Sequence, residues 1–113
     1  MNTNLSKSLF SNITRRNVVI VGAKRTMIGQ FMGGLSNYTA AHLGTIAASG
    51  ALKSCNVDPH EVEEVIIGNV ISSGMGQAPA RQVCIGSGMK PDTSCTTINK
   101  VCSSGMKSVM FAS

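Results

Sequence analysis

Two continuous apolar runs, at residues 18–23 and 65–70, are the clearest features of the hydrophobic pattern. Both consist mainly of Val and Ile without alternating polar residues, which is typical of strands that are covered on both faces. Between them, from Asn37 or Thr39 to Cys55, apolar side chains fall along one helical stripe, and Asn56 is a suitable C-terminal stop. The order strand, helix, strand predicts a crossover connection and a parallel sheet with helices on its faces.

The second half of the chain continues this alternation. Asp58 begins a capping pattern with proline at the next position, which predicts a short helical turn. A second helix is expected at residues 79–87, closed by Gly88, and a third short strand at residues 95–98. A last helix opens near Cys102. The pattern therefore predicts an α/β fold with three strands and three helices.

The last predicted helix has few polar positions apart from Lys107 and its serines. A helix that is apolar nearly all round is typical of one buried between two layers. No Gly, Asn or Pro follows its final apolar residues before Ser113. We therefore expect the chain to be the first part of a longer domain, with this helix truncated.

The excess of positive charge is concentrated at the N-terminus. Residues 1–17 hold three basic residues and no acidic one, whereas residues 18–113 hold seven basic and five acidic residues. The body is nearly balanced and its basic residues form no stripe, so a nucleic-acid-binding surface is not expected. No apolar run approaches the roughly 20 residues that a membrane-spanning helix needs.

The N-terminal 17 residues are rich in Ser, Thr and Asn, and Leu5, Leu9 and Ile13 fall on one helical stripe. This combination is typical of a mitochondrial transit peptide. The alternative is a disordered leader of a cytosolic protein. The sequence therefore predicts a mitochondrial matrix location, with the cytosol as the alternative.

The glycine clusters and histidines carry little specific chemistry. Gly22 and Gly29 have the spacing of a phosphate-binding loop, but the required Lys-Ser/Thr is missing, and residues 74–79 break the dinucleotide-binding pattern. His42 and His60 have no nearby cysteine or carboxylate pattern that would orient them. We expect tight turns at the glycines and packing or surface roles for both histidines.

Four cysteines occur, and none forms a Cys-x-x-Cys pair, so a zinc site of four ligands is not expected and no metal is predicted. Cys55, Cys84 and Cys95 are expected to be reduced, small core residues. Cys102 differs, because it lies where a strand turns into a helix among small residues. The helix dipole and first-turn amides favour the thiolate there, so Cys102 is a candidate nucleophile, with a buried structural thiol as the alternative.

Five segments, in order along the chain, resemble the thiolase family. They lie at residues 18–26, 31–35, 65–70, 76–82 and 99–105. The resemblance implies a partial thiolase N-terminal domain at residues 18–113, within a layered αβαβα fold. Met27, where most thiolases have proline, and Ser103, where alanine is common, depart from the family pattern without removing a reacting group.

The resemblance implies an acyl transfer through a cysteine. Cys102 would take the acetyl group of one acetyl-CoA as a thioester, and a carbanion made from a second acetyl-CoA would attack it, giving acetoacetyl-CoA and CoA reversibly. In the family, a histidine of a Gly-His-Pro segment and a second cysteine of a Cys-x-Gly motif assist. Neither follows Cys102 in this chain, so we expect the chain alone to be inactive.

Within the family, residues 95–102 and 105–107 are most similar to the mitochondrial branch that acts on acetoacetyl-CoA. The resemblance implies coenzyme A thioesters as substrates, no covalently bound cofactor, and a homo-oligomeric intact protein. Two alternatives stay open: a 3-ketoacyl-CoA thiolase for longer chains, and a non-catalytic piece that acts as an interaction module.

Overall fold

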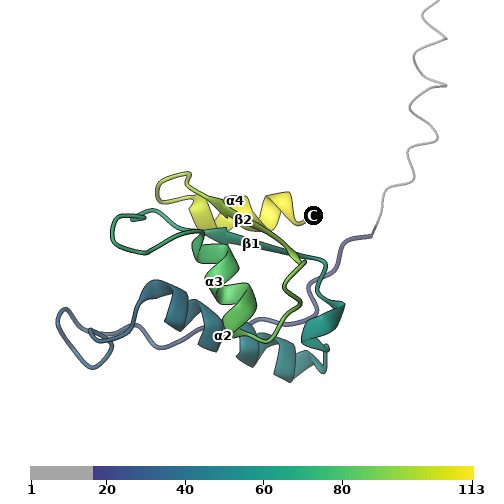
Figure 1. The fold of residues 1–113 in the computed structure, drawn as a ribbon, viewed down its shortest axis with the longest axis horizontal. Coiled ribbons are helices and arrows are strands. Elements are labelled where there is room, and N and C mark those ends of the chain that lie inside the picture. The colour runs from purple at the N-terminus through teal and green to yellow at the C-terminus, as the bar shows by residue number, and fades with distance from the viewer. Residues whose placement is uncertain (1–16) are drawn as a thin grey trace, which may run out of the picture.

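The structure is a computed structural model of the chain, and it describes residues 17–113. Its centre is a two-stranded parallel sheet of β1 (Glu64–Gly68) and β2 (Ser94–Ile98). Helix α3 (Pro79–Gly86) connects the strands, and α4 (Ser104–Phe111) follows β2. Figure 1 shows α4 on one face of the sheet and α3 on the other, with α2 beneath α3. The predicted α/β class and the parallel pairing are confirmed.

Helix α2 (Ala40–Cys55) begins and ends with residues suited to those positions. The hydroxyl of Thr39 accepts a hydrogen bond from the N–H of His42 at 3.1 Å, which satisfies one donor of the first turn. Asn56 adopts the left-handed conformation with φ 55° and donates its N–H to the carbonyl of Leu52. The predicted helix and its C-terminal stop are therefore confirmed.

Small residues allow α2 and α3 to pack closely. A Cβ at Gly44 of α2 would lie 2.9 Å from Cγ2 of Val83 on α3, so only glycine permits this approach. A cluster of buried side chains lies between α3 and the sheet. It consists of Val65, Ala80, Cys84 and Met89.

The short helical turn predicted after Asp58 is present as a 3-10 turn, η1 (Pro59–Glu61). The carboxylate of Asp58 accepts a hydrogen bond from the N–H of His60 at 2.9 Å. Proline occupies the first position, where its missing N–H costs nothing. The turn leads the chain from α2 into β1.

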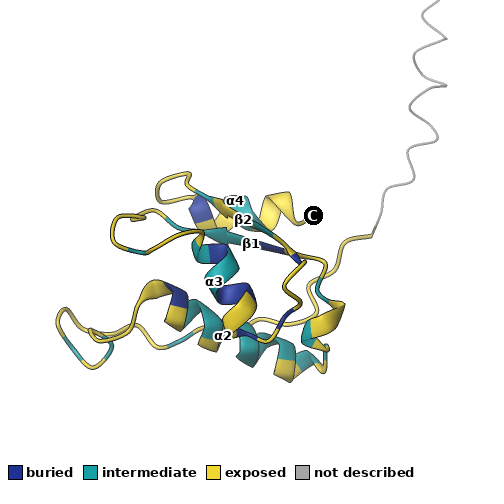
Figure 2. Cartoon of the chain, in the orientation of Figure 1, coloured by how far each residue is buried: buried dark blue, intermediate teal, exposed yellow. Residues whose placement is uncertain are grey.

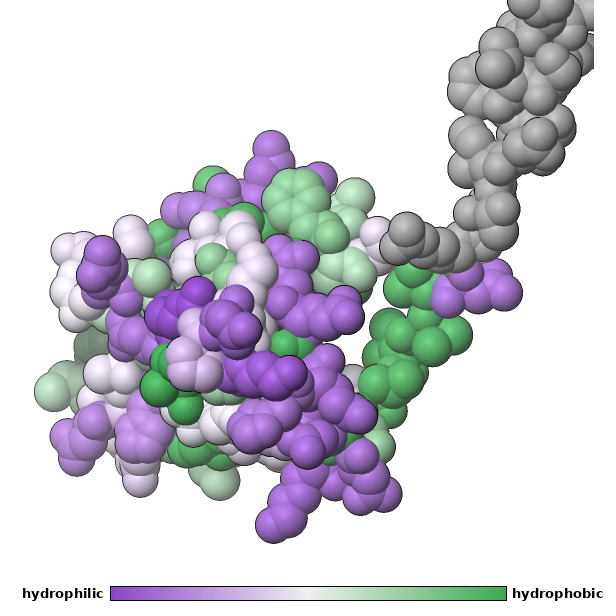
Figure 3. All heavy atoms as spheres, turned by 45° about the vertical axis from the view of Figure 1, so that its right-hand side comes forward, coloured by the Kyte–Doolittle hydropathy of each residue, from purple (hydrophilic) through white to green (hydrophobic). Residues whose placement is uncertain are grey.

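The strand predicted at residues 18–23 does not form, and this prediction is wrong for the described structure. The run is without regular hydrogen bonding, and Val19 and Ile20 are 72% and 83% exposed. Figure 3 shows it as a green band next to the grey segment. Gly22 lies against α2, where an added Cβ would be 3.2 Å from the sulfur of Cys55. Because the run lies along α2 and not beside the sheet, its backbone has no strand to pair with.

Helix α4 is not buried between two layers as its composition predicts. It covers β1 and β2 with one side, and Ser104 is its one buried residue. Met106, Val109, Met110 and Phe111 are between 54% and 66% exposed, and Figure 2 shows most of α4 in yellow. Within residues 17–113 no further layer of structure covers the outer side of α4, so these apolar side chains face outward.

Two predictions concern other parts of the chain. The transit-peptide stripe of Leu5, Leu9 and Ile13 lies outside the described residues. Among the helices of residues 17–113, none combines the length and apolar character that crossing a bilayer requires.

Candidate functional site

Cys102 lies in the tight turn between β2 and α4. Its side chain is exposed, two residues before the first residue of the helix. The structure therefore places it at a strand-to-helix turn, as the sequence predicts, but just outside the first helical turn. Within residues 17–113 the thiol is exposed rather than buried.

The residue before the cysteine has an unusual backbone conformation. Val101 has φ +49°. Three other non-glycine residues in the described chain have positive φ, and they are Met32, Asn56 and Ala78. Val101 is the one β-branched residue among them, and β-branched residues rarely adopt this region. Such strain persists only where the surroundings determine it, and it is concentrated at functional sites.

Two side chains hold Val101 in this conformation. Its N–H donates to Oδ1 of Asn99 at 2.8 Å, and its carbonyl accepts a hydrogen bond from the hydroxyl of Ser104 at 2.6 Å. The same hydroxyl accepts the N–H of Lys100 at 2.8 Å. Neither Asn99 nor Ser104 is predicted from the sequence as a site residue, although an asparagine at a strand end is a known turn signal.

The turn is also fixed to the end of β1. Nδ2 of Asn99 donates to the carbonyl of Val70 at 3.0 Å, and the N–H of Asn69 donates to the carbonyl of Ile98 at 2.9 Å. A Cβ at Gly68 would lie 2.4 Å from the carbonyl carbon of Ser104, so the start of α4 rests directly on the backbone of β1. The carboxyl ends of both strands thus meet at Cys102, the edge where parallel sheets usually bind ligands.

The segment before α3 belongs to the same edge. The N–H of Ala80 donates to the hydroxyl of Thr97 in β2 at 3.0 Å. The amide of Gln82 donates to the carbonyls of Met75 and Gln77 at 2.8 and 2.9 Å, closing the Gly-rich loop after β1. Two of the segments that carry the family resemblance, residues 76–82 and 99–105, therefore lie on neighbouring parts of one surface.

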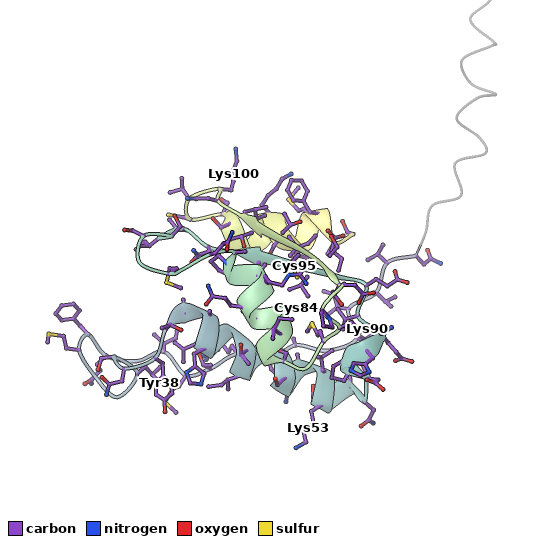
Figure 4. The ribbon with its side chains drawn as sticks, in the orientation of Figure 1. Tyr38, Lys53, Cys84, Lys90, Cys95 and Lys100 are labelled. Atoms are coloured by element: carbon purple, nitrogen blue, oxygen red, sulfur yellow. The ribbon has the colours of Figure 1, made fainter. Side chains whose placement is uncertain are left out.

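The first turn of α4 leaves donors available beside the cysteine. In the described chain, the N–H groups of Gly105 and Met106 have no backbone acceptor. Unpaired N–H groups and the helix dipole make this end of a helix favourable for negative charge. Lys100 projects from the turn into solvent (Figure 4). This arrangement suits a thiolate or the developing oxyanion of a thioester.

Neither histidine assists Cys102 here. His42 is exposed in the first turn of α2 and packs edge-on against the ring of Tyr38, with centroids 5.1 Å apart. His60 is exposed in η1. Within residues 17–113, no hydrogen bond joins a histidine side chain to Cys102. Both therefore occupy the packing or surface roles that the sequence predicts.

The other cysteines lie away from the turn. Cys84 of α3 is 0% exposed, while Cys55 and Cys95 are half-buried. Cys84 and Cys95 are neighbours between α3 and β2 (Figure 4). Burial raises the pKa of the Cys95 thiol, and the adjacent Cys84 raises it further, whereas Arg81 lowers it. These thiols pack as the sequence predicts.

One tripeptide resembles the family's second cysteine motif in its letters only. Residues 84–86 read Cys-Ile-Gly, but the thiol of Cys84 is fully buried and donates to the carbonyl of Lys90 at 3.6 Å. A buried thiol of this kind cannot meet a substrate at Cys102. In the described chain, no three His, Cys, Asp or Glu residues lie together as metal ligands.

The chain is similar in sequence to acetyl-CoA acetyltransferases. The family model of the thiolase N-terminal domain matches residues 18–113. Acetyl-CoA acetyltransferase 1 of Arabidopsis thaliana is 57% identical over 98 residues, which are 87% of this chain and 24% of that protein. The mitochondrial acetyl-CoA acetyltransferase of Rattus norvegicus is 51% identical over 109 residues, which are 96% of this chain and 26% of that protein.

The structure is similar to that of a solved relative. The Acat5 thiolase from Ascaris suum, crystallised in complex with coenzyme A, superposes with a TM-score of 0.80 at 40% sequence identity. The match covers 81% of this chain and 24% of that chain. The chain therefore spans about a quarter of the length of the relatives that it matches.

Proposed function

Because the chain belongs to the thiolase family, we propose that the complete protein containing it is a thiolase-type acyltransferase with Cys102 as its nucleophile. The observation that carries this proposal is the exposed thiol of Cys102 after the strained Val101, at the strand-to-helix turn. A nucleophile needs an accessible reacting atom and nearby donors for the charge that develops. Of the four cysteines, Cys102 combines both.

In the first step, the thiolate of Cys102 attacks the carbonyl carbon of an acyl-CoA thioester. A carbon–sulfur bond forms to Cys102, the bond to the sulfur of coenzyme A breaks, and coenzyme A takes up the proton that Cys102 lost. The exchange replaces one thioester with another, so little net free energy is released or required. The free N–H groups of Gly105 and Met106 are candidates to hold the thioester oxygen.

In the second step, a proton is removed from the methyl carbon of a second acetyl-CoA, and the carbanion attacks the acyl-Cys102. The carbon–sulfur bond to Cys102 then breaks and acetoacetyl-CoA leaves. This step needs a base and an acid. Since neither His42 nor His60 is placed beside Cys102, we propose that the 113-residue chain alone does not catalyse condensation, and that the family's downstream His and Cys complete the site.

The Arabidopsis and rat relatives support acetyl-CoA as the acyl donor, because both are acetyl-CoA acetyltransferases. A preference for longer 3-ketoacyl chains is the alternative. The rat relative supports a mitochondrial location, and the family resemblance supports a homo-oligomer. Comparing thiolysis rates of acetoacetyl-CoA and a longer 3-ketoacyl-CoA would separate the two substrate classes.

An acyl-enzyme experiment tests the nucleophile. The complete protein is mixed with acetyl-CoA, quenched in acid and digested, and the cysteine peptides are analysed by mass spectrometry. We expect one acetyl group on the peptide that contains Cys102. In the Cys102→Ser variant, thiolysis of acetoacetyl-CoA should fall by roughly 10⁴-fold or more.

The matched control is Cys55→Ser, which removes a half-buried thiol of α2 and should leave both labelling and turnover within about twofold of the parent, as expected for a group outside the reacting centre. Acetyl groups on a different residue, or full turnover by the Cys102→Ser variant, would overturn the assignment.

A further inference from the structure

The backbone of Val101 is held on both sides by side chains that the proposed chemistry does not use. Asn99 accepts its N–H at 2.8 Å, and Ser104 donates to its carbonyl at 2.6 Å. The N–H of Ser104 also donates to that carbonyl, at 3.1 Å. Both peptide groups of Val101 are therefore fixed, in a conformation that valine alone would leave.

The two side chains are themselves anchored in different parts of the fold. Ser104 is 2% exposed and its hydroxyl also accepts the N–H of Lys100 at 2.8 Å. Asn99 reaches across to the loop after β1, where its Nδ2 donates to the carbonyl of Val70 at 3.0 Å. The conformation of Val101 is thus determined by β1, β2 and α4 together.

The φ and ψ angles of Val101 set the direction in which the next residue leaves the turn. If Val101 relaxed to an ordinary β or helical conformation, the Cα–Cβ bond of Cys102 would point elsewhere. The sulfur would then no longer lie at its place before the first turn of α4. Displacements of about 1 Å in a reacting group are enough to slow catalysis by about 10²-fold.

We propose that Asn99 and Ser104 are positioning residues, which hold Val101 in the left-handed conformation and thereby fix the sulfur of Cys102 for acyl transfer. This inference rests on the proposed function. It assigns no chemical step to either side chain. Their effect is exerted through the backbone of Val101.

The experiment is a double-mutant cycle in the complete protein. Ser104→Ala removes the hydroxyl that holds Val101, and we expect kcat for thiolysis of acetoacetyl-CoA to fall by about 10²-fold with KM within about twofold of the parent. Val101→Gly supplies a residue that adopts positive φ without strain. In the Val101→Gly background, Ser104→Ala should cost less than about fivefold, because the two changes are coupled.

Asn99 provides a second variant that does not disturb the core, because its side chain is exposed. Asn99→Ala should also lower kcat and slow the alkylation of Cys102 by iodoacetamide. Asn99→Asp keeps an oxygen acceptor for the N–H of Val101 and should recover most of that loss. The matched control is Ser108→Ala, which removes a half-buried hydroxyl that donates to the carbonyl of Gly105 at 2.7 Å within α4, and should leave kcat unchanged.

The outcomes separate this inference from the function on which it rests. If Cys102→Ser retains turnover, the proposed function fails. If Cys102→Ser is inactive while Ser104→Ala and Asn99→Ala both keep the parent kcat, the nucleophile stands and the positioning role is wrong. The positioning role would also be wrong if Ser104→Ala lowered kcat by the same factor with valine or with glycine at position 101. The hydroxyl would then act independently of the backbone strain at Val101.

Discussion

Two regions of the chain are both rich in apolar residues and have opposite outcomes. The unit from β1 to α4 is held by a strand ladder, a buried cluster and a turn in which the N–H and the carbonyl of Val101 are both hydrogen-bonded. The segment of residues 18–38 passes along α2 with its Val and Ile side chains exposed. Apolar side chains alone therefore do not make a strand, because each backbone N–H and C=O also needs a partner.

The difference extends to how closely the backbones approach. In the unit from β1 to α4, glycine lets two main chains touch at Gly68, whereas Gly34 in the exposed segment has nothing within 4 Å of an added Cβ. Close packing of this kind transmits any change at one element to the next. The chain around Gly34 has no such contact, so substitution there should be tolerated.

The largest effect on stability should come from Gly68→Ala. The new Cβ would lie 2.4 Å from the carbonyl carbon of Ser104 and 2.6 Å from the N–H nitrogen of Gly105, so β1 and α4 must move apart. We expect a loss of about 3 kcal/mol in the free energy of unfolding, measured by urea titration. Gly34→Ala is the matched control and should change it by less than about 0.5 kcal/mol. Equal effects at both positions would contradict the contrast between the regions.

A smaller effect is expected from shortening a valine in each region. Val83 is 1% exposed between α2 and α3, and Val19 is 72% exposed in the N-terminal run. Val83→Ala leaves a cavity and should lower the unfolding free energy by about 2 kcal/mol. Val19→Ala removes the same atoms from a solvated surface and should stay within about 0.5 kcal/mol of the parent in the same titration. A loss above about 1 kcal/mol at Val19 would show that the run is packed after all.

Local signals in the sequence were sufficient for much of the fold. The stop at Asn56 acts within one turn of the helix that it ends, so the C-terminus of α2 could be predicted, whereas its start was predicted only as Asn37 or Thr39. The same holds for the proline start of α3 and the strand that follows it. Whether residues 18–23 pair as a strand could not be predicted, because pairing depends on which chain segment lies beside them. The exposure of the outer face of α4 depends on its neighbours in the same way.

The candidate site was predictable in position but not in construction. Small residues after a strand indicated a nucleophile at Cys102, and the family resemblance supported it. The strain at Val101 and the two side chains that hold it arise from contacts between residues of three elements. A serine hydroxyl that bonds the carbonyl three positions earlier is a common local motif, but nothing in the sequence pattern predicts that the valine it meets has positive φ.

The smallest effect concerns the ionisation of Cys95 at the interface of α3 and β2. Its pKa is raised by burial and by the neighbouring Cys84, so in the folded chain it stays protonated at a pH where the same thiol in the unfolded chain ionises. Below the usual cysteine pKa this difference has no cost. As the pH rises through the usual value toward the raised one, the unfolded state loses its proton first, and folded stability declines.

Alkylation measures this directly, since only the thiolate reacts with iodoacetamide. The rate at Cys95, followed by peptide mass spectrometry over a pH series, should rise at higher pH in the folded chain than in the same chain in urea. The exposed Cys102 should be alkylated before Cys95 throughout. Cys84→Ala removes the neighbouring thiol and should move the Cys95 profile toward lower pH. A profile that stays fixed in this variant would mean that burial alone determines the shift, and identical profiles in folded and unfolded chains would mean that the α3–β2 interface is open to solvent.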